Sequence, residues 1–394
     1  MENNGARLAS LESEALTALA VAAIKGEAPS VFPFEADTKR LYKLAKSNYI
    51  IGILYPAVKA ISDSLPDDFV SLWKNETAKQ AVYLLIQNRQ RDELKELLSR
   101  ANMPFVGLKG YVIGGFYPTE LIRACADIDI AVPSAERKRV RRLLIENGYT
   151  FSDRGANHDS YEKNGVSIEV HHHLYSETPL FYDYFKGIFQ RMERVTDTAC
   201  EYRMNDVDFT VFQVMHAYRH FTSGGIGLRL LLDHYITSKN ISVPENQLQP
   251  VLEALGMWRF YCLIDGISYK LFSGDALETD EAFVIDYMIN GGIFGTERNN
   301  ASMKHSEYRR SSTFRYILQR TFLPFYDMKI RYPILGKNPL LLPFCHIHRW
   351  IKALFNYSGG IKSEISASNS VTPEDIEEKR RLKRIIGYKD GGEF

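Results

Sequence analysis

The alternation Asp127-Ile128-Asp129-Ile130 is the strongest constraint on how this 394-residue chain folds. Successive side chains of a strand point to opposite faces, so the two carboxylates share one face and the two isoleucines share the other. The isoleucines then enter a core, and the acids stand together at a polar site. Two carboxylates held in this way are typical of a site for a hard cation such as Mg²⁺.

The residues before the acids predict a strand followed by a glycine-rich turn. Pro104 opens the segment, and FVGLK after it indicates a buried strand that runs into Gly110. Glycines at 110, 114 and 115 leave the backbone free to approach a phosphate closely. Lys109 and Arg123 are candidates for binding phosphate oxygens, or are ordinary surface cations.

A hairpin supplies the third acid. Asn164-Gly165 tolerates the positive φ angles of a tight I′ turn, so the segments on either side predict two antiparallel strands. Glu169 lies on the return strand, on the face opposite Ile168 and Val170. Sequential strands are usually neighbours, and we therefore expect Glu169 beside the two aspartates.

Composition excludes several other classes of protein. The net charge of +1 gives no overall field for nucleic acid or anionic membranes, and four widely spaced cysteines indicate neither a disulfide framework nor a thiolate zinc site. The first residues lack a basic signal-peptide region, and their apolar run is too short to span a bilayer. We expect a soluble, cytoplasmic protein without a transmembrane segment.

Helical patterns flank the central segment on both sides. Residues 10–100 place Ala78, Ala81, Val82 and Leu85 on one helical face. Helices are expected to end near prolines, namely Pro56, Pro66 and Pro104. A second helical segment, 209–235, is interrupted at Ser223-Gly224-Gly225 and carries His216, His220, Arg229 and Asp233.

The fold class that these patterns predict is α+β, with a small mixed sheet between helical regions. We divide the chain into an N-terminal helical region 1–100, a core 101–205, a helical domain 206–290 and a basic, aromatic C-terminal region 291–394. Residues 304–331 either stack on RNA or, as we favour, form core aromatics with a solvated cationic face. The segment 340–355 is interpreted as a buried helix, with a membrane-interface helix as the alternative.

The motifs together resemble a known family. GLKGYVIGGFYP, Arg123, ADIDIAV, His158 in NHDSYEK and GVSIEVHHHL resemble the uncharacterised nucleotidyltransferase family of the DNA polymerase beta-type superfamily, over about residues 104–175. The resemblance implies that Asp127, Asp129 and Glu169 are the catalytic carboxylates and metal ligands. It also implies a turn that meets the triphosphate, either Lys109-Gly110 or Gly114-Gly115.

The activity implied is transfer of a nucleoside monophosphate from an NTP, ATP included, to a hydroxyl of an unknown acceptor, which is a small molecule, a protein or RNA. Mg²⁺ or Mn²⁺ is the expected metal. Zinc is the alternative, bound by Glu169, His171 and His173 or by the His216–His220 pair. The acceptor is expected at His220, Arg229 and Asp233. A nucleotide sensor without turnover and an RNA-modifying transferase remain alternative functions.

Overall fold

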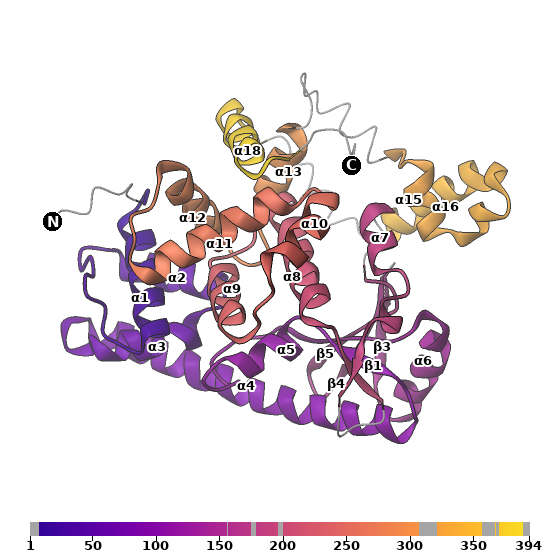
Figure 1. The fold of residues 1–394 in the computed structure, drawn as a ribbon, viewed down its shortest axis with the longest axis horizontal. Coiled ribbons are helices and arrows are strands. Elements are labelled where there is room, and N and C mark those ends of the chain that lie inside the picture. Colours follow the sequence, from indigo (N-terminus) through magenta and orange to yellow (C-terminus); the bar gives the residue numbers. More distant parts are fainter. Residues whose placement is uncertain are drawn as a thin grey trace.

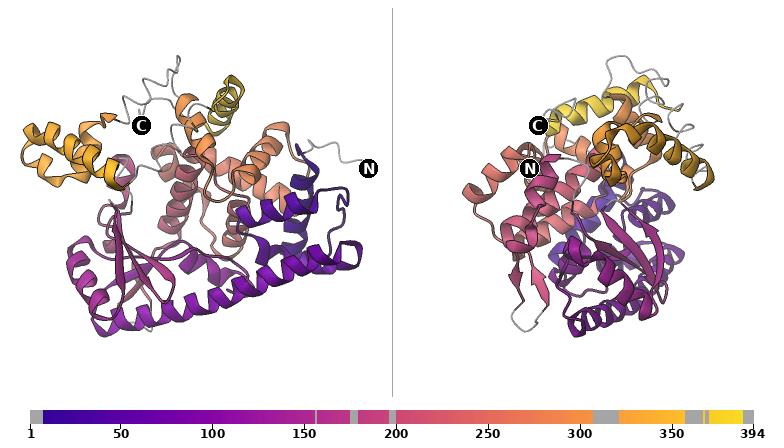
Figure 2. Two further views of the ribbon diagram at one scale, coloured as in Figure 1. Left: turned by 180° about the vertical axis from the view of Figure 1, so that it is seen from behind. Right: turned by 90° about the vertical axis from the view of Figure 1, so that its right-hand side faces the viewer.

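The computed structural model describes residues 8–155, 157–174, 179–195, 200–306, 321–356, 367 and 370–388. The chain is mostly helical, with a seven-stranded mixed sheet in the middle, as an α+β fold requires (Figure 1). One long helix runs beneath both the sheet and the helices beside it. Figure 2 shows the same arrangement from behind, with this helix extending from the sheet to the N-terminal helices.

Helices precede, interrupt and follow the sheet. The N-terminal region forms α1 (Leu11–Lys25), α2 (Thr38–Ser47), α3 (Ile51–Ala60) and α4 (Asp67–Arg100). The central region contributes α5 (Gly110–Ile113), α6 (Arg137–Glu146) and α7 (Pro179–Phe185). The rest of the described chain forms α8 (Asp206–Thr222), α9 (Arg229–Asn240), α10 (Glu245–Ala254), α11 (Trp258–Ser273), α12 (Thr279–Gly291), α13 (Glu297–Ser306), α15 (Phe325–Arg331), α16 (Leu342–Asn356) and α18 (Pro373–Ile386).

The sheet has the strand order β3-β4-β5-β2-β1-β7-β6. Its strands are β1 (Phe105–Gly107), β2 (Asp127–Ala131), β3 (Thr150–Arg154), β4 (His158–Lys163), β5 (Val166–His171), β6 (Glu193–Arg194) and β7 (Glu201–Arg203). Strand β2 lies parallel to β5, with Asp129 directly opposite Glu169. The predicted hairpin is confirmed, because β4 and β5 pair antiparallel about Asn164 and Gly165, whose φ angles are 54° and 74°.

The two faces of the sheet bury different cores. On one face, Ile128, Ile130, Ile168 and Val170 pack with residues of α4 and α6. On the other face, Val106, Leu108 and Ala131 join a large core that unites the N-terminal helices with α8, α9, α11 and α12. The strand alternation therefore directs the acids of β2 toward the helices that follow the sheet in sequence, and away from α4.

Helix α4 buries a different face from the one that its apolar pattern suggests. Val82 and Leu85 are 57% and 55% exposed, whereas Trp73, Leu84, Leu94 and Leu98 are buried. The buried face also carries glutamines that donate hydrogen bonds to the loop before β2. Gln80 reaches the carbonyl oxygen of Ile122, and Gln87 reaches that of Cys125. These donors satisfy backbone carbonyls that have no strand partner, so the inward face of α4 combines apolar packing with hydrogen bonding.

The proline boundaries are right in two cases and wrong in one. Pro66 caps the N-terminus of α4, and Pro104 immediately precedes β1. Pro56 instead lies inside α3, where it removes one helical hydrogen bond. The helix continues because Ile53, Leu54 and Val58 on either side of the proline are buried.

The break between α8 and α9 brings two helix ends against a distant segment. Gly224 and Gly225 have φ angles of 133° and 131°, which only glycine adopts without strain. A side chain on Gly224 would meet Asn300, and one on Gly225 would approach the backbone of Gly295. The break therefore fixes the start of α9 against the segment between α12 and α13.

The C-terminal region differs from the sequence expectation. Of the basic, aromatic stretch 304–331, residues 307–320 lie outside the described part of the chain. The interpretation of 340–355 as a buried helix is wrong for its described side chains, because Phe344, Ile347 and Ile351 on one face of α16 are exposed. The small core around Met328, Leu335 and Cys345 does not extend to that face. Among the described residues, no helix is long and apolar enough to cross a membrane.

Candidate functional site

The three predicted carboxylates meet on one face of two paired strands. Asp127 and Asp129 alternate with buried isoleucines on β2, and the parallel pairing places Glu169 of β5 directly beside Asp129. One oxygen of each carboxylate lies within 4.8 Å of the others. The expected neighbourhood of the two strands is therefore confirmed, and it gathers three oxygen donors of the kind that Mg²⁺ and Mn²⁺ prefer.

Lys109 supplies the positive charge at this cluster. Its Nζ lies 2.8 Å from Oδ1 of Asp129. The residue has a φ of 45° and a ψ of −117°, which is an unfavourable backbone conformation for any residue other than glycine. This conformation occurs at the end of β1, where the chain turns into α5 and delivers the ammonium group to the acids.

The carboxyl groups differ in their affinity for a proton. Burial, together with the neighbouring charge of Asp129, raises the pKa of Asp127 to about 7. Burial also acts to raise the pKa of Asp129, but Lys109 and His171 outweigh it and hold that pKa below its ordinary value. One lysine thus compensates one aspartate and leaves the other poorly compensated, so the cluster favours a cation.

Two histidines adjoin the carboxylates on the hairpin. His171 Nε2 lies 2.9 Å from Asp129 Oδ1 and 3.4 Å from Glu169 Oε2, and His158 Nε2 lies 3.4 Å from Glu169 Oε1. His158 was not predicted to be near a metal. The Asn164-Gly165 turn could have predicted this position, because a two-residue turn fixes the register of the hairpin and places residue 158 opposite 171.

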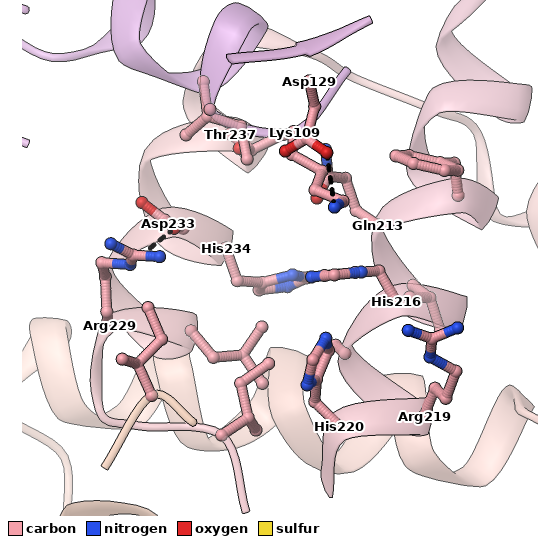
Figure 3. A pocket seen from close by; sticks show the side chains of 18 of the residues that line it. Lys109, Asp129, Gln213, His216, Arg219, His220, Arg229, Asp233, His234 and Thr237 are labelled. Atoms are coloured by element: carbon pink, nitrogen blue, oxygen red, sulfur yellow. Dashed lines mark hydrogen bonds and ion pairs between the residues drawn. The ribbon is translucent and has the colours of Figure 1, made fainter. Parts of the chain in front are cut away.

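A cavity of about 450 Å³ opens over the acids. The sheet contributes Lys109, Asp129 and Glu169, while α8 and α9 form two facing walls. Figure 3 looks into this space, with Gln213, His216 and His220 on the α8 side and Asp233 and His234 on the α9 side. The remaining lining includes apolar side chains, among them Phe212, Leu230, Ile241, Val243, Phe260 and Ile264.

Burial favours the neutral form of the two α8 histidines, His216 and His220. Burial lowers the pKa of His220 to about 4, and it lowers the pKa of His216 well below its ordinary value. The rings of His216 and His220 contact edge to face, with centroids 4.4 Å apart. Figure 3 shows the rings of His216 and His234 pointing toward one another across the cavity. The imidazoles of His216 and His220 can therefore accept or donate hydrogen bonds without carrying charge.

Comparison with known proteins assigns the chain to a family. The model of the uncharacterised nucleotidyltransferases matches residues 35–272, more than half of the sequence and the whole of the site described above. The chain belongs to this family of nucleotidyltransferases. The solution structure of the antibiotic-resistance factor ANT(2'')-Ia is similar with a TM-score of 0.34 and 12% sequence identity, covering 47% of this chain and 99% of that one. No curated protein matches the sequence significantly.

The two glycine turns of this nucleotidyltransferase lie in different places. Gly110 lines the cavity with Lys109, and a side chain on it would collide with the sulfur of Cys125. Gly114 and Gly115 form a short 3₁₀ turn away from the cavity lining, and a methyl group on either would meet nothing within 4 Å. The geometry therefore favours Lys109-Gly110 as the turn next to the acids.

The predicted phosphate ligand Arg123 is engaged elsewhere in the nucleotidyltransferase. Its Nε and Nη2 donate to the two oxygens of Asp233 on α9, at 2.8 and 2.7 Å. Tyr117 donates a third hydrogen bond to the same carboxylate, and Arg229 Nε lies 3.7 Å from it. Arg229 also donates to the carbonyl oxygen of Ala124. This junction ties the loop before β2 to α9.

The zinc sets that the sequence left open are not the ones that the structure assembles. Among the described residues, two sets of possible metal ligands converge. One is His158, Glu169 and His171, and the other is Asp127, Asp129 and Glu169. His173 instead contacts the rings of His172 and Tyr182. The His216–His220 pair belongs to neither convergent group.

Proposed function

We propose that this nucleotidyltransferase moves a nucleoside monophosphate from an NTP, such as ATP, to a hydroxyl of a small-molecule acceptor and releases pyrophosphate. The observation that carries the proposal is the convergence of Asp127, Asp129 and Glu169 at the mouth of the cavity. Family membership supplies the reaction class, and the oxygen-only ligand set favours Mg²⁺ or Mn²⁺.

The carboxylates would hold the divalent cation, which when bound neutralises charge on the phosphate oxygens. Asp127 and Asp129 present their oxygens from one strand, so their spacing is set by the backbone. Glu169 would complete the ligand set. Lys109 compensates Asp129 in the free protein, and we propose that its ammonium group turns to the triphosphate when a cation takes its place there.

Gly110 lets the backbone of the turn lie close to the phosphates, which is why we assign the triphosphate to Lys109-Gly110. Arg123 is assigned a positioning role instead, because phosphate binding would require it to leave Asp233. A buried arginine joined by two hydrogen bonds to an aspartate that is itself only 13% exposed is costly to separate from it. Arg229 and Asp233 accordingly hold α9 in place, and the acceptor contact remains with His220.

The charges of the cavity restrict the acceptor. The carboxylates among its described lining residues are the three acids of the cluster and Asp233, and Asp233 is already met by Arg123 and Arg229. The walls contributed by α8, α9 and α11 carry apolar side chains, imidazoles and the cations Arg219 and Arg229. We propose an uncharged or anionic acceptor with an apolar part, since a polycation would find no free carboxylate there.

The reaction is tested with α-labelled NTP, Mg²⁺ and fractionated hydroxyl-containing metabolites, by following pyrophosphate release and label transfer. Wild type should transfer label, and Asp127→Asn should not. The control is Glu162→Gln, an exposed glutamate on the hairpin that carries Glu169, which should keep activity. NTP binding without pyrophosphate release in any fraction would instead identify a nucleotide sensor. Salt-sensitive retention of RNA with label on the RNA would identify an RNA-modifying enzyme.

The division between nucleotide and acceptor is tested at His220. His220→Ala should leave the Kd for Mg·NTP within about threefold, a change below roughly 0.7 kcal/mol. Transfer to the acceptor should fall strongly, because the imidazole lines the wall and not the acid cluster. Loss of nucleotide affinity in this variant would place the nucleotide, rather than the acceptor, against α8.

A further inference from the structure

Three side chains of the β4–β5 hairpin are arranged as ligands of a single metal ion. Glu169 lies between two histidines, with Oε1 3.4 Å from His158 Nε2 and Oε2 3.4 Å from His171 Nε2. Both separations exceed the roughly 2.7–3.2 Å of an ordinary hydrogen bond between nitrogen and oxygen. Each imidazole faces a different oxygen of Glu169, and one ligand atom from each of the three residues lies within 4.8 Å of the others, close enough for a single ion to draw them together.

The backbone fixes this arrangement. His158 and His171 are directly opposed in the antiparallel register, so their side chains share one sheet face, and their ring centroids are 5.0 Å apart. Glu169 is two residues before His171 on the same strand and therefore on the same face. A tight turn at Asn164-Gly165 closes the hairpin and prevents a register shift.

All three ligands line the cavity. An ion bound by them would have its remaining coordination position open to this space, as in sites with three protein ligands and one exchangeable ligand. The donor set of two imidazoles and one carboxylate differs from the all-oxygen set of Asp127, Asp129 and Glu169. Imidazole nitrogen suits zinc and related transition ions, whereas carboxylates alone suit Mg²⁺.

We propose that His158, Glu169 and His171 form a transition-metal site for Zn²⁺ or a similar ion, distinct from the carboxylate cluster and sharing Glu169 with it. His171 Nε2 now contacts Asp129 Oδ1 at 2.9 Å, and metal binding replaces that contact. The site therefore has two states, one with His171 hydrogen-bonded to Asp129 and one with His171 on the ion. Because Glu169 is shared, an ion on the histidines alters how the acid cluster binds Mg²⁺.

The proposal does not depend on turnover, and its test measures metal binding directly. Chelator-treated protein is titrated with Co²⁺, which reports a nitrogen-containing site of low coordination number by its visible absorption, and Zn²⁺ is then used to displace it. We expect one equivalent of absorbing Co²⁺ per chain. Asp127→Asn should keep this signal, because Asp127 belongs to the carboxylate cluster alone.

Variants of the hairpin separate the two sites. His158→Ala and His158→Gln should each weaken Co²⁺ binding at least about tenfold, an effect of about 1.4 kcal/mol, and His171→Ala should do the same. His173→Ala is the matched control, since this neighbouring histidine contacts rings outside the cluster, and it should bind Co²⁺ as wild type does. Circular dichroism identifies any variant that fails to fold.

Two results would overturn the proposal. If the His158 variants fold and bind Co²⁺ with unchanged affinity and spectrum, the histidines are not ligands. If Asp127→Asn abolishes the absorbing species, the ion occupies the carboxylate cluster and no separate site exists. Failure of nucleotidyl transfer affects neither measurement, so the two proposals can fail independently.

Discussion

The acidic side chains that line the cavity fall into two groups, which differ in how far neighbouring cations compensate their charge. At the sheet, Asp127, Asp129 and Glu169 converge around the single ammonium group of Lys109, and the pKa of Asp127 rises to about 7 through burial and its neighbour Asp129. On α9, Asp233 receives hydrogen bonds from Arg123 and Tyr117 and has Arg229 nearby. Burial there is outweighed by these partners, and the pKa of Asp233 falls.

The difference separates a binding site from a structural link. A carboxylate with every oxygen satisfied has no capacity left for a ligand, and removing a partner leaves a buried charge uncompensated. A cluster with surplus negative charge is stabilised when a cation binds to it. Sequence proximity alone does not distinguish the two, since arginines and acids occur at both positions.

The largest effect is expected at the uncompensated cluster. Asp127→Asn should lower nucleotidyl transfer at least about 1,000-fold, about 4 kcal/mol of barrier, because a cation ligand is lost. The thermal midpoint should stay the same or rise, since the substitution relieves repulsion with Asp129. Transfer rates and melting curves of the same preparation check both statements. A variant that melts well below wild type would make this acid structural, like Asp233.

The second effect is expected at the compensated acid. Asp233→Ala should reduce the free energy of unfolding by about 3–5 kcal/mol, because Arg123 is left buried without its partner. Urea denaturation gives the value, and the exposed Asp153→Ala is the control. If Asp233→Ala is stable but loses nucleotide affinity, Asp233 belongs to the binding site and the contrast between the two acids fails.

A smaller effect on stability is expected from His220, on the α8 wall of the same cavity. The unfolded chain protonates His220 near its ordinary pKa of 6.5, whereas in the folded chain burial lowers this pKa to about 4. The unfolded state therefore binds more protons in this window, and stability falls as pH is lowered through it. Between about pH 7.5 and pH 4.5 the loss from His220 amounts to about 2–3 kcal/mol.

His220→Gln should flatten the acid side of the stability profile by up to that amount. Urea unfolding of both proteins at the two pH values checks it, with the exposed His348→Gln as the comparison. His216 acts in the same direction, so the variant retains part of the slope. An unchanged profile would mean that His220 takes up a proton as readily in the folded chain as in the unfolded one.

The smallest effect distinguishes the two glycine turns. Gly114→Ala should change stability by no more than about 1 kcal/mol, and in the stabilising direction, because its φ of −54° is helical and the added methyl group meets nothing. Mg·NTP affinity should stay unchanged. Gly110→Ala should instead weaken both stability and nucleotide binding, because of the clash with Cys125. Reversed results would assign the triphosphate to Gly114-Gly115.

Local patterns in the sequence determined much of the sheet and its acids. The Asp-Ile-Asp-Ile alternation has one geometric solution on a strand with one buried face, and the Asn-Gly turn fixes the register of the hairpin. These are short-range rules, and they also contained the position of His158. The expected pairing of β2 with β5 is correct, but these strands are not successive, since β3 and β4 lie between them in the sequence; the order of the whole sheet, and not a short-range rule, places them side by side.

The tertiary structure alone decided the roles that depend on distant partners. In the sequence Arg123 is a candidate phosphate ligand. In the structure its guanidinium binds Asp233 of α9, more than a hundred residues later in the chain. Val82 and Leu85 form an apolar face on α4, yet this face is exposed in the fold, while Gln80 on the inward side donates to the loop before β2. Burial and charge compensation are properties of the whole fold, because each depends on groups that the local sequence does not contain.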